Sequence, residues 1–177
     1  QYDAVFGGSV SIAAEIEIIK SRTVMMDVAE KLKLDIQASP RYEPWIGAAV
    51  ARYYPGDGVA KAWFGMDQYA WGGEEIEVQS LLVPEALLGR PLTLVAAQEG
   101  KFRVLDDVGS ELLQGAVGAR AEADLASGGS IVLFVARLKA RPGTEFTLRK
   151  LPLVAAAGRL SGAFSAAANV LACSPGS

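Results

Sequence analysis

The residue types that most often carry enzyme chemistry are scarce in this sequence. Its 177 residues include no histidine and a single cysteine, Cys173. Histidine is the commonest general base and metal ligand, and a zinc site built on cysteines needs several of them. No Gly-x-x-x-x-Gly-Lys-Ser/Thr motif is present to bind nucleotide phosphates. We therefore expect no catalytic residues, no metal site and no cofactor, and expect that the chain is not an enzyme.

Paired carboxylates are the remaining candidates for catalysis, because two acids in different environments suffice for glycoside hydrolysis. Three pairs are close in sequence: Glu15 with Glu17, Glu74 with Glu75, and Asp106 with Asp107. Acidic residues usually lie on the surface, so the sequence favours solvated charges over catalysis. A two-carboxylate glycosidase stays open as an alternative that needs a cleft between its acids.

Aromatic residues are concentrated between positions 41 and 71. Glycines interrupt this stretch without a clear period, which predicts short helical turns and loops. Trp and Tyr rings stack on sugar faces and also pack in cores. The candidate sugar-contacting residues are Trp45, Trp63, Tyr69 and Trp71. Core packing is the favoured role, and a free-standing carbohydrate-binding module with an aromatic surface is the alternative.

Periodicity predicts the elements that must position these residues. Apolar residues at helical spacing predict an amphipathic helix over residues 9–34, bent or broken near Ser21 and Arg22. After Gly73 the period becomes two, which is typical of a strand. Further strands are predicted at 92–97, 101–106, 111–114, 131–139 and 144–149, a loop at 115–130 and a helix at 152–164.

Clustered strands between helices predict an α+β fold with a small, largely antiparallel sheet flanked by helices. We expect one domain spanning residues 1–177, with 165–177 as an atypical or disordered tail. The formal net charge of −3 and the scattered basic residues argue against nucleic-acid binding. No stretch approaches the roughly 20 apolar residues of a membrane-spanning helix, although a longer parent protein could be anchored.

Four segments form an ordered series along the chain: residues 15–22 (EIEIIKSR), 40–47 (PRYEPWIG), 69–78 (YAWGGEEIEV) and 141–146 (RPGTEF). In this order they resemble the periplasmic domain of Wzz/Wzc-like polysaccharide co-polymerases, and most closely the branch with a tyrosine autokinase. The resemblance spans residues 6–164, and the sequence after Phe164 departs from the family pattern.

This resemblance implies a scaffold domain on the periplasmic face of the bacterial inner membrane, in a parent protein anchored by transmembrane helices outside this chain. The parent would control the chain length, polymerisation and export of exopolysaccharide or capsular polysaccharide. Its implied partners are further copies of itself, a polysaccharide polymerase, an outer-membrane export protein and the nascent polysaccharide. A parent of the autokinase branch would also carry a cytoplasmic kinase domain.

Overall fold

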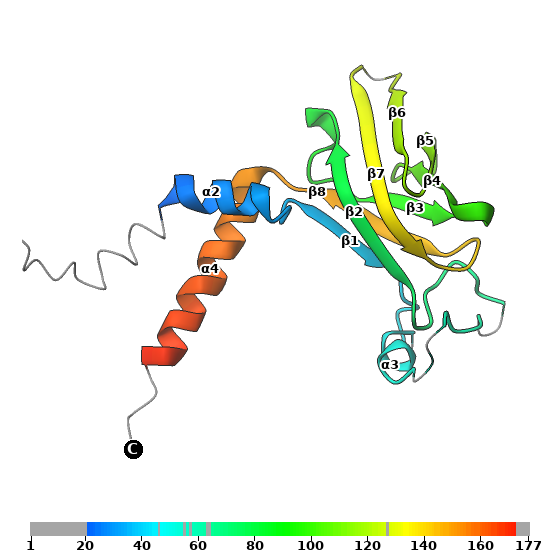
Figure 1. The fold of residues 1–177 in the computed structure, drawn as a ribbon, viewed down its shortest axis with the longest axis horizontal. Helices are drawn as coiled ribbons and strands as arrows, with labels where there is room; N and C mark the ends of the chain where they lie inside the picture. Colours follow the sequence, from blue (N-terminus) through cyan, green and yellow to red (C-terminus); the bar gives the residue numbers. More distant parts are fainter. Residues whose placement is uncertain are drawn as a thin grey trace, which may run out of the picture. The chain divides into compact units, whose positions relative to one another are not determined.

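The computed structural model describes residues 21–172, except for positions 46, 55, 57, 63, 64 and 127 (Figure 1). The chain divides into two compact units, one made of residues 1–35 with 152–177 and the other of residues 36–151. The part of the predicted first helix that precedes Ser21 lies outside the described residues, as do residues 173–177 of the predicted tail.

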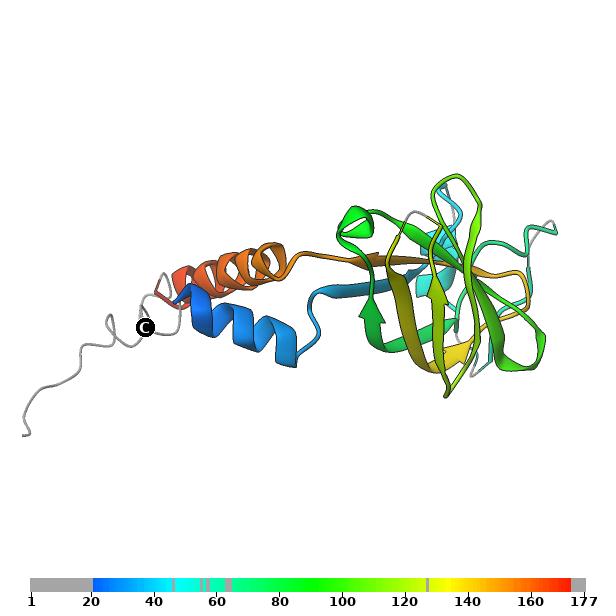
Figure 2. The same cartoon turned by 90° about the horizontal axis from the view of Figure 1, so that it is seen from above.

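The first unit is a pair of packed helices, α2 (Arg22–Lys31) and α4 (Leu153–Ala172), which lie side by side in Figures 1 and 2. Met25 and Ala29 of α2 pack with Ala156 and Ala157 of α4, so small side chains let the helices approach closely. The helix predicted at 152–164 is confirmed, but it continues to Ala172. Within the described residues, neither α4 nor any other helix combines the length and apolar character needed to cross a membrane.

The second unit contains two antiparallel sheets. One has the strand order β1-β8-β3-β4-β5 and the other β2-β7-β6, and every ladder between named strands is antiparallel. The strands are β1 (Ile36–Pro40), β2 (Glu75–Leu82), β3 (Leu92–Ala96), β4 (Lys101–Leu105), β5 (Glu111–Ala116), β6 (Arg120–Asp124), β7 (Ser130–Lys139) and β8 (Glu145–Lys150). The short helices are α3 (Gly47–Arg52), η1 (Glu85–Leu87) and η2 (Gln98–Gly100). The predicted α+β class and antiparallel pairing are confirmed, with two sheets where the sequence suggested one.

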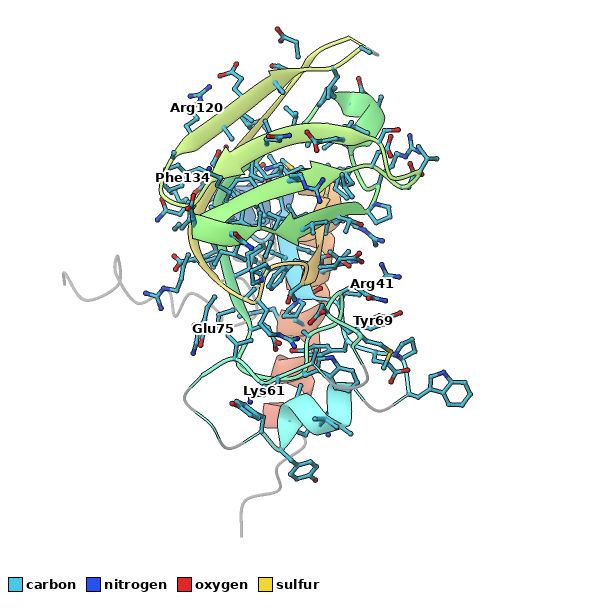
Figure 3. The ribbon with its side chains drawn as sticks, turned by 90° about the vertical axis from the view of Figure 1, so that its right-hand side faces the viewer. Arg41, Lys61, Tyr69, Glu75, Arg120 and Phe134 are labelled. Carbon is cyan, nitrogen blue, oxygen red and sulfur yellow. The ribbon has the colours of Figure 1, made fainter. Side chains whose placement is uncertain are left out.

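Strand β6 lies where the sequence predicted only a loop, so the loop prediction for 115–130 was wrong. Its residues alternate between the interior and solvent, with Ala121 buried and Glu122 exposed. Alanine contributes too little hydrophobicity for this alternation to stand out in the sequence. The strand pairs with β7, and Arg120 and its register partner Phe134 lie on the outer side of this sheet (Figure 3).

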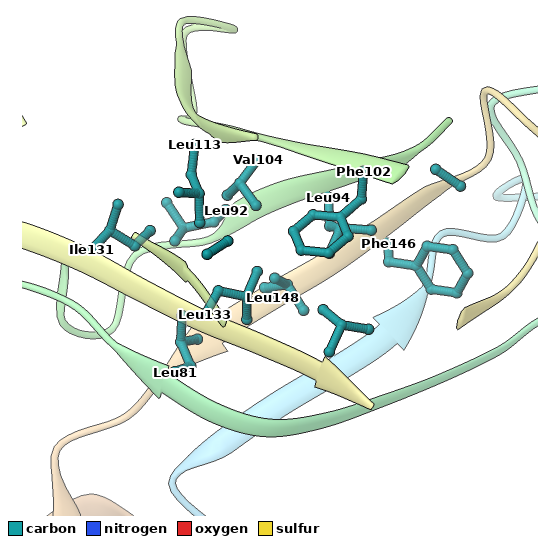
Figure 4. Packing of buried hydrophobic residues seen from close by; sticks show 13 residues of the cluster. Leu81, Leu92, Leu94, Phe102, Val104, Leu113, Ile131, Leu133, Phe146 and Leu148 are labelled. Carbon is teal, nitrogen blue, oxygen red and sulfur yellow. The ribbon is translucent and has the colours of Figure 1, made fainter. Parts of the chain in front are cut away.

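The core of the second unit lies between the inner faces of the two sheets, and we call this unit the sandwich (Figure 4). Leu81 and Leu133 come from the three-stranded sheet, while Leu94, Phe102 and Phe146 come from the five-stranded sheet. These positions follow the period-two pattern of their strands, because alternate side chains point to the same face. The core therefore supports the loops that leave the strand ends.

Gly115 is required by the close packing of β5 against its neighbours. A Cβ atom at this position would lie 2.6 Å from Phe102 Cζ and 2.7 Å from Ala121 Cβ. We expect Gly115→Ala to lower the free energy of unfolding by about 2 kcal/mol, measured by urea denaturation of the 177-residue chain. Gly58→Ala is the matched control, because a Cβ there meets no atom within 4 Å. Equal stability of the two variants would contradict this packing argument.

Candidate functional site

The aromatic residues lie in one long connection between β1 and β2, which we call the aromatic segment (residues 41–74). In agreement with the sequence prediction, its described part is irregular apart from the short helix α3. Figure 3 shows Arg41, Lys61 and Tyr69 of this segment in the lower part of the unit, with the strands above them. The segment is therefore held by particular contacts rather than by a ladder of strand hydrogen bonds.

A buried ion pair anchors the end of the aromatic segment. The Glu74 side chain is fully buried and accepts hydrogen bonds from the backbone N–H groups of Trp71 at 3.0 Å and Gly72 at 2.6 Å. Arg141, on the turn between β7 and β8, donates to Glu74 Oε1 at 3.5 Å and to the Tyr69 carbonyl oxygen at 3.0 Å. One guanidinium and one carboxylate thus join the segment to the sandwich. The sequence-based expectation that Glu74 is a solvated charge was wrong, because its oxygens have partners inside the protein.

Backbone geometry requires glycine beside this ion pair. Gly73 has a φ of +78°, and a Cβ atom there would approach the Gly58 carbonyl oxygen to 2.0 Å. The neighbouring Gly72 carbonyl accepts a hydrogen bond from Ala60 N–H at 2.8 Å. Two distant parts of the aromatic segment therefore meet through a close backbone contact that a side chain would block.

A second set of contacts joins the two ends of the segment to each other and ties the segment to β8. The Ala70 N–H donates to the Arg41 carbonyl oxygen at 2.8 Å, and the Glu145 N–H donates to that of Gln68 at 2.9 Å. The Arg41 guanidinium lies 5.7 Å from the centre of the Tyr69 ring and 2.5 Å from Glu145 Oε2. Arg41 thus occupies one face of the Tyr69 ring.

The neighbouring Tyr42 has a shifted pKa. Burial, followed by the negative charge of Glu74, raises the pKa of the Tyr42 phenol above its ordinary value.

The four candidate sugar-contacting aromatics have different environments. Trp71 has no exposed surface, and its indole N–H donates to the Met66 carbonyl oxygen at 3.2 Å, so neither ring face is open to a ligand. Tyr69 is half-buried beneath Arg41, whereas 90% of Trp45 is exposed. Trp63 lies outside the described residues. Of the three described positions, Trp45 is the one that the structure presents openly.

Sequence reasoning did not select Tyr53, which is 82% exposed at the C-terminal end of α3. It also passed over Arg141 as a structural residue, although the sequence RPGTEF served as a family marker. No local signal distinguishes a buried arginine from a surface arginine. An acidic residue directly after two glycines, as at Glu74, is a weak indication of a carboxylate that binds neighbouring backbone N–H groups.

The carboxylates predicted as a possible catalytic pair, Asp106 and Asp107, have structural partners. Asp106 Oδ1 accepts hydrogen bonds from two N–H groups of its own turn. The Arg90 guanidinium, which donates to Asp107 Oδ2 at 2.6 Å, lowers the pKa of Asp107, whereas a general acid needs a raised pKa.

A cavity of about 450 Å³ lies beside this turn, and the cavity brings together acids that are distant in the sequence. Its lining is Asp106, Ser110, Glu111, Leu112, Asp124, Leu125 and Ala126. Glu111 accepts from Gln114 at 2.5 Å and lies 3.8 Å from Arg103, so its carboxylate is engaged on the sheet surface. Within the described residues, no group of three or more His, Cys, Asp or Glu side chains is arranged to hold a metal ion.

The described residues form an antiparallel β-sheet unit that carries the aromatic segment, and a unit of two packed helices. Comparison with known proteins specifies the family of the chain. Residues 36–151, which are those of the second unit, match the family described as the N-terminal domain of the tyrosine-protein kinase Wzc. The chain belongs to this family, as its resemblance to the Wzz/Wzc-like co-polymerases suggested.

Individual relatives agree with this assignment. The chain is 39% identical over 140 residues to the putative tyrosine-protein kinase EpsB of Ralstonia nicotianae, covering 77% of this chain and 18% of that protein. It is 32% identical over 139 residues to the putative tyrosine-protein kinase AmsA of Erwinia amylovora, covering 78% and 16%. It is 28% identical over 137 residues to the tyrosine-protein kinase Wzc of Salmonella typhi, covering 77% and 16%. The chain thus spans less than a fifth of these relatives, and the kinase domain of the family lies outside it.

Proposed function

We propose that this chain is an extracytoplasmic scaffold domain of an inner-membrane protein that controls the chain length, polymerisation and export of exopolysaccharide or capsular polysaccharide. It acts through surface contacts and the geometry of an oligomer. The observation that carries this proposal is the family match over residues 36–151, the whole of the sandwich unit. The engaged carboxylates of the sandwich are consistent with a non-catalytic role.

The proposed partners are further copies of the parent protein, a polysaccharide polymerase and an outer-membrane export protein. The domain would lie on the periplasmic face of the inner membrane, with membrane anchors of the parent outside this chain. A free-standing carbohydrate-binding module remains the second candidate. The observation that favours it is the 90% exposure of Trp45.

The location can be tested with a single introduced thiol. Val108 is 81% exposed in the turn between β4 and β5, so a cysteine there should be accessible without loss of stability. In a parent protein whose native cysteines, including Cys173, are replaced with serine, we expect Val108→Cys to react with a membrane-impermeant maleimide in intact spheroplasts. Labelling that requires lysis of the cells would place the domain in the cytoplasm and contradict the proposal.

The function can be tested by deleting residues 36–151 from the parent gene. We expect a changed length distribution of the surface polysaccharide on electrophoresis, with the parent protein still present in the membrane fraction. Deletion of residues 173–177, which follow helix α4, is the control for a shortened gene product. An unchanged length distribution after deletion of 36–151 would contradict the proposed function.

A further inference from the structure

Two aromatic side chains at opposite ends of α3 are almost fully exposed. Trp45 precedes the helix and Tyr53 follows it, with exposed fractions of 90% and 82%. Large aromatic rings make the greatest contribution when they are buried, so two uncovered rings beside one short helix indicate a surface used for contacts. These rings differ from Trp71 of the same segment, which is fully buried.

The backbone of both residues is held in place. The Glu43 carboxylate accepts a hydrogen bond from the Trp45 N–H at 2.9 Å, and the Glu43 carbonyl accepts one from Gly47 N–H at 3.1 Å. The Tyr53 N–H donates to the carbonyl oxygens of Ala49 and Val50 at 3.3 and 3.2 Å. The rings are thus presented from a hydrogen-bonded turn and helix end, which lowers the entropy lost when a ligand binds.

Basic side chains accompany the two rings. Arg52 directly precedes Tyr53, and Lys61 follows in the same segment (Figure 3); both are exposed. No carboxylate of a described residue lies within salt-bridge distance of either cation. By sequence, residues 41–61 carry three basic residues, Arg41, Arg52 and Lys61, and two acidic residues, Glu43 and Asp57, whereas the whole chain has a net charge of −3. The surface around α3 is therefore locally suited to an anionic ligand.

The spacing of these groups distinguishes between kinds of ligand. A stable protein interface needs a contiguous apolar centre, and a membrane-surface helix needs a broad apolar face. Seven residues separate the rings in the sequence, and the six of them that form α3, GAAVAR, include no aromatic side chain, so the described residues here show neither arrangement. Separate exposed rings accompanied by exposed cations suit a chain of acidic sugars, since each ring can stack on one sugar and each cation can pair with a carboxylate.

We infer that the α3 surface, formed by Trp45, Arg52, Tyr53 and Lys61, binds an acidic polysaccharide. The inference rests on the proposed function and adds to it the ligand class and the residues that contact it. Trp45 and Tyr53 stack on sugar faces, while Arg52 and Lys61 bind carboxylates. The Arg141–Glu74 ion pair holds the aromatic segment and does not contact the ligand.

The test measures binding of the 177-residue chain to polygalacturonate as the acidic probe and dextran as the neutral probe. We expect tryptophan fluorescence to change on addition of polygalacturonate, with weaker binding to dextran and weaker binding in added salt. Trp45→Ala with Tyr53→Ala should weaken polygalacturonate binding at least about tenfold, as should Arg52→Gln with Lys61→Gln. Binding by the ring variant is measured by calorimetry, because that variant lacks the reporting indole.

Matched control variants remove similar groups elsewhere on the sandwich. Val108→Ala removes exposed apolar surface, and Lys101→Gln with Arg120→Gln removes two exposed cations. Both controls should bind polygalacturonate like the original chain. Unchanged binding by the ring and cation variants would overturn the inference, as would equal weakening by the controls.

Two further outcomes would also overturn it. The first is no binding to polygalacturonate but binding to vesicles of phosphatidylglycerol, and the second is concentration-dependent self-association that Trp45→Ala abolishes. These results would leave the proposed function intact if deletion of residues 36–151 still changes polysaccharide length. Conversely, deletion of residues 36–151 could leave the polysaccharide length unchanged while the chain still binds polygalacturonate. That result would contradict the proposed function but support the binding surface.

Discussion

Replacing Arg141 with alanine should lower the free energy of unfolding of the sandwich unit by about 3 kcal/mol. The substitution leaves the Glu74 carboxylate buried without its cation, and it removes the hydrogen bond to the Tyr69 carbonyl oxygen. An uncompensated buried charge is among the costliest defects that one substitution can create. Urea denaturation followed by circular dichroism measures the change.

Two further variants separate the ion pair from a general effect of losing an arginine. Arg137→Ala removes an exposed arginine from β7 and should change stability by less than about 0.5 kcal/mol. In a double-mutant cycle, Arg141→Ala and Glu74→Ala together should cost less than the sum of the single changes, because the second change removes the charge stranded by the first. Strict additivity would show that Arg141 and Glu74 do not interact.

The elements that the sequence predicted well have large apolar residues in period two. The predicted strands at 92–97, 101–106 and 131–139 agree with β3, β4 and β7 within one residue at each end. Their Leu, Val and Phe residues dominate the pattern, and short turns join β3 to β4. Local patterning is sufficient where neighbouring strands are also neighbours in the chain.

Strands β1 and β6 were not predicted, for two different reasons. The strand β1 ends at Pro40 and pairs with β8, more than 100 residues later in the chain. Its place at the edge of the sheet tolerates a proline, which the sequence alone indicates as a strand breaker. The strand β6 pairs with β7, the next strand in the chain, but its small side chains hide the alternation between interior and solvent. Only β1 depends on a partner that folding brings near.

The candidate site shows the same limit. The aromatic segment was predictable as a region, because its composition differs from the rest of the chain. Which rings are exposed was not predictable, since Trp45 and Trp71 have similar sequence surroundings of proline or glycine. The difference comes with tertiary contacts: Glu74 binds the Trp71 backbone N–H and is paired with Arg141 of the distant β7–β8 turn, whereas Trp45 is 90% exposed. Exposure of a ring is a tertiary property.

The two tryptophans therefore offer a direct comparison of the two roles in this segment. Trp71→Ala should lower the free energy of unfolding by about 4 kcal/mol, because it removes a fully buried ring and its hydrogen bond to Met66. Trp45→Ala should change stability by less than about 0.5 kcal/mol. Both variants are measured by urea denaturation with circular dichroism, which does not depend on the removed indole.

The same pair separates anchoring from binding. If the buried part of the segment holds the exposed part in place for binding, Trp71→Ala should weaken polygalacturonate binding as it destabilises the aromatic segment. Trp71→Phe should restore much of the stability and of the binding, because it returns a ring to the buried position. Trp45→Phe should retain part of the binding, because a ring remains available for stacking. Equal stability losses at the two tryptophans would contradict this division of roles, since it requires that the buried Trp71 ring contributes to stability and the exposed Trp45 ring does not.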